Sequence, residues 1–339
     1  MSKAFQLQEA ELSFLGSDFD SLTGPMPIAM AARGPSARAA VLAKLENGRY
    51  TLESSACLCG SSEPGTVLAR IDRYRLPHRS VLCHQCGLVR TDPRMTAASY
   101  ADFYANHYRA IYERPGQSAE SLFAHQADNA RRRFLFLRRH AKKTPESVIE
   151  LGCGGGWNLL PFSGSGARVV GFDFDPEYLN AGRHRGLDLR PGGVDEASKL
   201  GIMYHAVILS HVVEHMLDPV KELQRVRTLL YPDGLLFAEV PSILKAGHPL
   251  LRYFQSAHTY SFAPESFRPL LEQAGFKLVA MNGSIASVWK PADVVSGSWS
   301  ADKMLAPRVL RHLQSVQPPG LFRRLARGLR RLFPLKGMQ

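Results

Sequence analysis

Three groups of residues in this chain have types and spacings that could do chemistry. The first is a glycine-rich run behind the acid Glu150, with Gly152, Gly154 and Gly156 at alternate positions. Because glycine lacks a Cβ, such a run lets the backbone turn sharply and come close to a ligand. Asp173 ends the next apolar run, where an acid suits the hydroxyl groups of a ribose. This group predicts a site for a nucleoside-containing ligand.

The second group combines histidines with an acid, mostly on the stretch that follows a later apolar run. Its members are His211, Glu214, His215 and, further along, His258. Histidine is the natural general base because its pKa lies near neutrality, so it can take the proton of an attacking hydroxyl. We expect these four residues on the acceptor side of the site. Helix capping or packing is the alternative role for His215.

The third group consists of two cysteine knuckles, each followed by a glycine. They supply Cys57, Cys59, Cys83 and Cys86. Two such knuckles can give four thiolates to a tetrahedral zinc ion. In the first knuckle a single residue separates the cysteines, which departs from the usual Cys-x-x-Cys spacing. Two interpretations stay open: zinc held by these thiols, with His78 or His84 as a substitute ligand, and a degenerate knuckle with free thiols.

The elements that must position these groups alternate between strands and helices. Apolar runs predict strands at residues 148–151, 168–173, 187–190, 206–210 and 235–240. Helices are expected at 129–143, 218–230 and 265–274, with a strand at 66–76 and a short helix at 37–45 before them. A final hairpin should turn at Asn282-Gly283. This alternation implies an α/β, Rossmann-like fold whose ligand lies at the carboxyl ends of a mostly parallel sheet.

Taken in order, these motifs resemble those of class I methyltransferases, which use S-adenosylmethionine (SAM). The resemblance rests on IELGCGGGW, YHAVILSHVVEHMLDP, YPDGLLFAEVP and HTYSFAPESF. It implies a seven-stranded sheet and SAM as cofactor, with Asp173 on the ribose. The methionine end would be held by Glu150, Gly152, Gly154 and Gly156. Asp195, expected at the adenine edge, and Ser210 are further cofactor-binding candidates.

Two local motifs refine the resemblance. Family members with a Glu-His pair at the position of Glu214 and His215 include quinone O-methyltransferases, in which a divalent metal can be held. Here His211 stands where their segment has its first glutamate. The stretch CHQCGLVRTDPRMTAASYADFYANHYRAIY, with its C-x-x-C-G-L start and its later Pro and Tyr residues, resembles the zinc-ribbon-like lead-in of a subgroup found among enzymes that modify sugars, glycans and natural products. It implies a structural zinc on the four cysteines.

Charge is concentrated at the carboxyl end of the chain. The net charge is +12, and the residues from Lys303 onward include nine Lys or Arg and no acid. Residues 321–335 predict an amphipathic helix with leucines on one side and arginines on the other. Such a helix could lie on an anionic membrane surface or pack against the protein itself. No apolar run is long enough to span a membrane and no secretory signal is present, so we expect a cytoplasmic protein, with the inner membrane face as a peripheral location.

Two missing motifs argue against a nucleic-acid substrate despite the basic tail. The stretch after the fourth expected strand, beginning Ser210-His211, lacks the Pro-Pro-aromatic motif used to methylate amino groups of bases. Cys153 lies in the glycine run and not near that strand, where methylation of cytosine carbon would need a nucleophilic thiol.

The sequence therefore predicts five segments. They are an N-terminal extension at 1–50, a zinc-ribbon-like module at 51–92, a helical lead-in at 93–145, a methyltransferase domain at 146–290 and a basic tail at 291–339. The expected activity is transfer of a methyl group from SAM to a hydroxyl of a small molecule, sugar or glycan, including a lipid-linked one. The alternative is a non-catalytic protein of this fold that binds nucleic acid or membrane through its tail.

Overall fold

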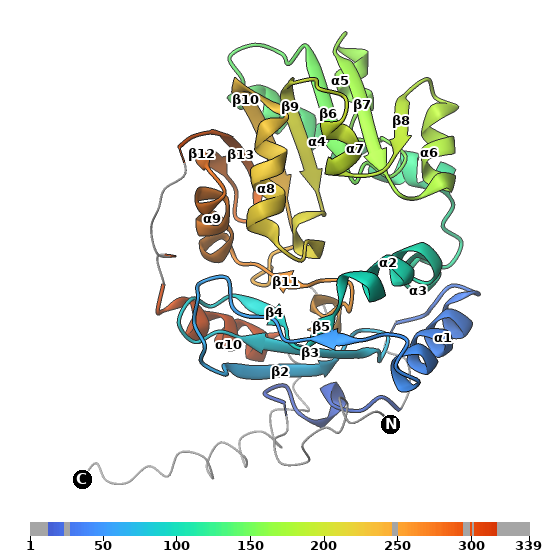
Figure 1. Cartoon of the computed structure of the whole chain (residues 1–339), viewed down its shortest axis with the longest axis vertical. Helices are drawn as coiled ribbons and strands as arrows, with labels where there is room; N and C mark the ends of the chain where they lie inside the picture. The colour runs from blue at the N-terminus through green and yellow to red at the C-terminus, as the bar shows by residue number, and fades with distance from the viewer. Residues whose placement is uncertain (1–12, 24–27, 246–249, 294–298, 300–301, 317–339) are drawn as a thin grey trace.

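The structure, a computed structural model, describes residues 13–23, 28–245, 250–293, 299 and 302–316. Its centre is a seven-stranded sheet with the order β12-β13-β10-β9-β6-β7-β8 (Figure 1). The strands are β6 (Ser147–Leu151), β7 (Arg168–Asp173), β8 (Asp188–Pro191), β9 (Tyr204–Ser210), β10 (Leu230–Glu239), β12 (Phe276–Met281) and β13 (Ala286–Pro291). The Rossmann-like α/β fold predicted from the sequence is confirmed.

The direction and order of the strands define one ligand-binding edge. The pairs from β10 through β9, β6 and β7 to β8 are parallel, whereas β13 is antiparallel to both β10 and β12. From β6 the chain first builds outward through β7 and β8 and then returns to add β9 and β10 on the other side. The crevice at such a reversal, beside the carboxyl ends of the strands, is where ligands bind in open α/β sheets.

Helices cover both faces of this sheet. One group packs around α4 on the first face, and a second group contains α8 and α9. The helices of the first group are α4 (Ala119–His140), α5 (Leu160–Gly164) and α6 (Pro176–Arg183), and those of the second are α7 (Val194–Ser198), α8 (Pro219–Thr228) and α9 (Pro264–Gln273). Helix α4 starts ten residues before the expected Asn129 because Ser118 and Ser121 form a capping box.

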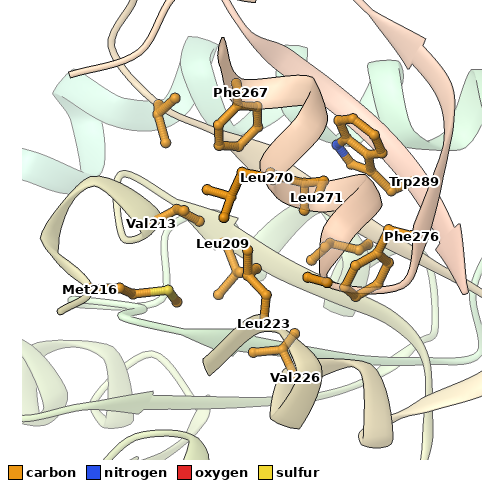
Figure 2. Close-up of a cluster of buried hydrophobic side chains, with 14 of the residues drawn as sticks. Leu209, Val213, Met216, Leu223, Val226, Phe267, Leu270, Leu271, Phe276 and Trp289 are labelled. Carbon is orange, nitrogen blue, oxygen red and sulfur yellow. The ribbon is translucent and has the colours of Figure 1, made fainter. Parts of the chain in front are cut away.

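A buried apolar cluster packs α8 and α9 against the large sheet. Figure 2 shows Leu223 and Val226 of α8 facing Leu209 of β9, with Phe267, Leu270 and Leu271 of α9 beside Phe276 and Trp289. Most of these side chains are fully buried. Burying a large apolar side chain stabilises a fold by about 1.5–3 kcal/mol, so this cluster fixes the position of the loop that leaves β9.

A second, smaller sheet lies below the first in Figure 1 and has the order β11-β4-β3-β2. Its strands are β2 (Thr66–Ile71), β3 (Pro77–Leu82), β4 (Val89–Thr91) and β11 (Tyr260–Ser261), and a separate pair joins β1 (Leu52–Glu53) to β5 (Arg94–Met95). The single strand expected at 66–76 is wrong, because the chain turns at Asp72 and starts β3 at Pro77. Strand β11 comes from the long segment after β10, so the two halves of the molecule share this sheet.

Further helices complete the lower half. They are α1 (Gly34–Glu46), α2 (Ala97–Asn106), α3 (Tyr108–Tyr112) and α10 (Leu305–Ser315). Figure 1 shows α2 and α3 between the level of the small sheet and that of the large sheet, and α10 beside the small sheet. The amphipathic helix expected at 321–335 lies outside the described residues. None of the described helices is long and apolar enough to cross a membrane.

Candidate active site

The glycine run forms a tight loop between β6 and α5, and its conformation requires glycine. The φ angles of Gly152, Gly154 and Gly156 are 68°, 54° and 77°, a region that side chains strongly disfavour. Space is also short, because a Cβ on Gly152 would come within 2.6 Å of the Val212 side chain, and one on Gly156 within 2.8 Å of Leu187. The loop backbone can therefore approach a ligand at the sheet edge without side chains in between.

Asp173, at the end of β7, is attached to this loop. One carboxylate oxygen accepts a hydrogen bond of 2.7 Å from the backbone N–H of Gly154, and the other accepts one of 2.9 Å from Asp175. Burial raises the pKa of Asp173. The structure thus brings the predicted ribose acid and the predicted glycine loop together at one point of the sheet edge.

Glu150 lies beneath the loop in a buried polar network. Asn158 donates a hydrogen bond of 2.6 Å to Oε1 of Glu150 and accepts one of 3.0 Å from Arg133 of α4. Arg133 also donates to Glu239 of β10 at 2.5 Å. The second oxygen of Glu150 is buried and has no hydrogen-bond partner among the residues that the structure describes, and burial raises the pKa of this carboxyl to about 8. An unpartnered carboxylate oxygen beneath the loop suits a cationic group of a bound ligand.

The remaining cofactor candidates have different surroundings. Ser210 ends β9, next to β6, on the same edge of the sheet. Asp195 is 62% exposed and forms an ion pair with Arg225 of α8. The ring of Phe174, directly after Asp173, is 78% exposed and lies near Gly193. Sequence reasoning missed Phe174, although an exposed aromatic residue beside a ribose acid is a signal for stacking on a base.

The acceptor-side residues form a compact cluster beside the end of β9. Nδ1 of His211 lies 3.4 Å from Oε1 of Glu214, and Nε2 of His215 lies 4.0 Å from the same oxygen. The rings of His215 and His258 meet edge to face, with centroids 4.9 Å apart. Glu214 is almost fully buried, and neither of its carboxylate oxygens has a hydrogen-bond partner among the described residues. The structure therefore brings all four predicted residues together around an acid that has imidazole neighbours but accepts no hydrogen bond from them.

Burial sets the proton state of the two inner histidines. It lowers the pKa of His215, and it lowers that of His258 well below the usual value, with the neighbouring His215 as a second cause. Nδ1 of His215 lies 2.9 Å from the carbonyl oxygen of Ala257, which can only accept, so this nitrogen carries the proton. Nε2, on the side of Glu214, is therefore the basic atom of the ring.

Tyrosines from α2 and α3 cover this cluster, and sequence reasoning missed them. The hydroxyl of Tyr104 lies 2.9 Å from Nδ1 of His215, and the ring of Tyr108 packs edge-on against the same imidazole. Glu214 and Asp173 both act electrostatically on Tyr108. Tyr108 thus borders the acceptor cluster through its contact with His215. The spacing of Tyr100, Tyr104, Tyr108 and Tyr112 at every fourth position was the available signal.

The small sheet holds His258 in place. The carbonyl oxygen of His258 accepts a hydrogen bond of 2.7 Å from the hydroxyl of Thr91, and the backbone N–H of Thr91 donates to Thr259 at 2.9 Å. Thr259 in turn donates to the carbonyl oxygen of Glu214 at 2.8 Å. The N-terminal half of the chain therefore positions part of the acceptor cluster.

Residues 123–281 match the family model described as a methyltransferase domain. The match spans the glycine loop, Asp173 and the acceptor cluster. The strand order agrees with it, since the resemblance implied a sheet of seven strands and the structure contains one. These residues form a class I methyltransferase domain. SAM is the cofactor of this family, as the sequence predicted.

Curated relatives are identical to the methyltransferase domain at about a quarter of the aligned positions. The ubiquinone biosynthesis O-methyltransferase of Cereibacter sphaeroides is 28% identical over 170 residues, which are 45% of this chain and 66% of that protein. The mitochondrial ubiquinone biosynthesis O-methyltransferase of Bos taurus is 26% identical, over 41% of this chain and 43% of that protein. The chain thus spans less than two thirds of the length of these relatives.

Solved structures of methyltransferases are similar as well. The 1,6-didemethyltoxoflavin-N1-methyltransferase of Burkholderia thailandensis aligns over 64% of this chain and 96% of its own, with 17% identity and a TM-score of 0.46. The glycopeptide N-methyltransferase MtfA aligns over 49% of this chain and 90% of its own, with 18% identity and a TM-score of 0.38.

Outside the methyltransferase domain match, the four cysteines of the knuckles converge. Their Sγ atoms all lie within 4.8 Å of one another, and three pairs are 3.4, 3.5 and 3.7 Å apart. These separations are too long for a disulfide and close to the ~3.8 Å expected between sulfurs around a tetrahedral zinc with bonds of about 2.3 Å. The donor set therefore fits zinc. Neither histidine is needed, because His84 bonds Thr66 and His78 lies beside Thr91.

Proposed function

We propose that this protein transfers a methyl group from SAM to a hydroxyl of a small-molecule, sugar or glycan acceptor. The observation that carries the proposal is Glu214. A buried carboxylate without a hydrogen-bond partner is costly, so it implies a ligand group that donates to it. It lies beside the end of β9 with two histidines that burial keeps neutral, which suits an acceptor hydroxyl.

The proposed roles follow from the chemistry of each group. Bound SAM supplies a methyl group on a positively charged sulfur that is already a good leaving group. The glycine loop and Asp173 would hold it, with Glu150 facing the ammonium of its methionine end. Glu214 would accept a hydrogen bond from the acceptor hydroxyl, and Nε2 of His215 would take the proton as the oxygen attacks. The carbonyl oxygen of Ala257 would hold His215 in the required tautomer, and Tyr104 would pack beside it.

The test combines cofactor binding with transfer of label. Full-length protein is incubated with SAM carrying a tritiated methyl group and with fractionated small molecules and glycans from cells. We expect label in an acid-stable product with the wild type, and a loss of about 100-fold or more with Glu214→Gln or His215→Gln at unchanged SAM affinity. Asp173→Ala should lose SAM binding. Binding of SAM by the wild type without any labelled product would contradict the proposal and favour a non-catalytic role.

We also propose that the basic tail brings the protein to an anionic membrane surface. Support comes from the sequence alone, because residues 321–335 lie outside the described structure. Each arginine near such a surface contributes about 1 kcal/mol, and salt weakens the effect. Co-sedimentation with neutral and anionic liposomes, with and without residues 320–339, tests this. Equal binding by the truncated chain would argue for packing of the tail against the protein.

A further inference from the structure

The turn between β2 and β3 presents one arginine, Arg73, in a fixed position. Asp72 closes the turn, because its Oδ1 accepts hydrogen bonds of 2.8 Å from the backbone N–H of Tyr74 and 2.9 Å from that of Leu76. The backbone N–H of Arg73 itself donates to the carbonyl oxygen of Phe254, on the segment that leads to β11, at 3.1 Å. These hydrogen bonds fix the backbone of the turn both internally and against the segment around Phe254. The Cα of Arg73 therefore has a fixed position from which its side chain extends.

The guanidinium of Arg73 lacks a counter-ion. It lies 5.4 Å from the ring centroid of Tyr74 and 4.9 Å from that of Tyr112, its Nε is buried without a hydrogen-bond partner, and it forms no ion pair with any described residue. Both carboxylate oxygens of the adjacent Asp72 already accept hydrogen bonds, since Oδ1 closes the turn and Oδ2 accepts from the Tyr112 hydroxyl and the backbone N–H of Ser256.

Four other arginines of the described chain also have a buried nitrogen without a hydrogen bond. Arg90, Arg109 and Arg308 each form an ion pair, with Asp92, Asp175 and Glu265 respectively, whereas Arg227 of α8, beside Gly275, forms none among the described residues. Arg73 is half-buried beside two tyrosine rings, so its guanidinium remains open to an anion that the described chain does not supply.

A continuous row of rings connects Arg73 to the acceptor cluster. The centroids of Tyr112 and Tyr108 lie 5.2 Å apart, and those of Tyr108 and His215 lie 6.2 Å apart. The charge of Arg73 contributes to the lowered pKa of His258, after burial and His215. The rings of Tyr112 and Tyr108 therefore link the guanidinium to the acceptor cluster.

We infer that Arg73 binds an anionic group, a carboxylate or a phosphate, on the acceptor, which makes the substrate an acidic ring compound bearing a hydroxyl. This inference rests on the proposed function, because it assigns the second half of the same acceptor site. The anion lies against Arg73, the ring packs along Tyr108 and Tyr112, and the hydroxyl reaches Glu214. A guanidinium suits carboxylate and phosphate because its planar donors can bind two oxygens at once.

The test measures binding of small probes and needs no knowledge of the acceptor. Full-length protein saturated with S-adenosylhomocysteine is titrated with benzoate, phenyl phosphate and neutral benzyl alcohol at constant ionic strength, and affinities are read by ligand-observed NMR. We expect at least one anion to bind about tenfold or more tightly than benzyl alcohol. Which anion binds better distinguishes a carboxylate acceptor from a phosphate one.

Variants then assign the preference to Arg73. Arg73→Gln should remove it, Arg73→Lys should keep part of it, and Arg49→Gln, at an exposed arginine of the same half, should leave it unchanged. Equal affinities for the anions and benzyl alcohol in the wild type would overturn the inference, and so would an anion preference that persists in a folded Arg73→Gln. Failure of the wild type to bind S-adenosylhomocysteine would count against the proposed function instead.

Discussion

Asn158 donates a hydrogen bond of 2.6 Å to Glu150 and so holds one oxygen of this buried acid while the other stays free. Burial raises the pKa of Glu150 to about 8, so the carboxyl is mostly protonated at pH 6.5 in the protein without cofactor. A SAM ammonium bound against it would lower that pKa and expel the proton. We therefore expect SAM binding at pH 6.5 to release close to one proton.

Calorimetry in buffers of different ionisation enthalpy measures this release. Glu150→Gln should bind SAM without it. Asn158→Leu should weaken SAM binding by roughly tenfold, because the acid loses the partner that orients it. Binding of SAM to the wild type without proton release would mean that Glu150 does not face the ammonium.

Gly182 of α6 supports the cofactor loop from the outside. A Cβ at this position would press into the backbone oxygen of Gly155 and the side chain of Leu189. Gly182 is not a predicted contact of SAM. We nevertheless expect Gly182→Ala to weaken SAM binding by tenfold or more, because the added Cβ has to displace the backbone of the cofactor loop at Gly155. Gly164→Ala in α5, where a Cβ meets nothing within 4 Å, is the matched control and should bind SAM normally. Equal SAM affinity in the two variants would contradict this account.

Zinc on the four thiols is a third prediction. Purified protein should contain one zinc per chain, and the double change Cys83→Ser, Cys86→Ser should abolish it and lower the melting temperature, because the site closes the small sheet. Cys153→Ser is the control, since this buried thiol lies in the glycine loop. Metal-free wild-type protein would favour the interpretation with free thiols.

Stability should depend on pH through His78. This side chain is buried, and burial lowers its pKa from 6.5 to about 4. Between these values the unfolded chain binds a proton that the folded chain does not, so the free energy of unfolding falls as the pH falls through this window. The full effect is about 3 kcal/mol. Urea unfolding at several pH values should show that the free energy of unfolding falls less with falling pH in His78→Phe than in the wild type. Identical slopes of the free energy of unfolding against pH in the two proteins would refute the role given to His78.

The sequence was sufficient where a motif has a local cause. The run from Glu150 to Gly156 predicts its own loop, because alternate glycines fit only a turn with positive φ. The position of Asp173 beside the glycine loop could be predicted because β6 and β7, which follow one another in the chain, also lie side by side in the sheet. The strands of the large sheet and the helices α8 and α9 could be placed for the same reason, within a few residues.

Sequence reasoning failed where contacts join distant parts of the chain. Tyr104 contacts His215, and Arg73 bonds Phe254, across long stretches of sequence, and nothing local to either residue indicates these contacts. The short first knuckle was ambiguous for the same reason. Only the fold shows that Cys57 and Cys59 reach the thiols of Cys83 and Cys86.

The pairing of β11 with β4 has a consequence for how this protein could change in evolution. Residues before α4 contribute the tyrosines and Arg73, and they fix the backbone of His258 through Thr91. The cofactor loop, in contrast, packs against residues after Ala119, such as Phe123 and Leu187, and the ion pair of Arg109 with Asp175 links it to the earlier part of the chain. Recombination that replaced the first hundred or so residues and kept Arg109 would therefore give a new substrate range to an inherited cofactor site. Cofactor and acceptor recognition are in this sense largely separately heritable within one chain, with His258 at the boundary between them.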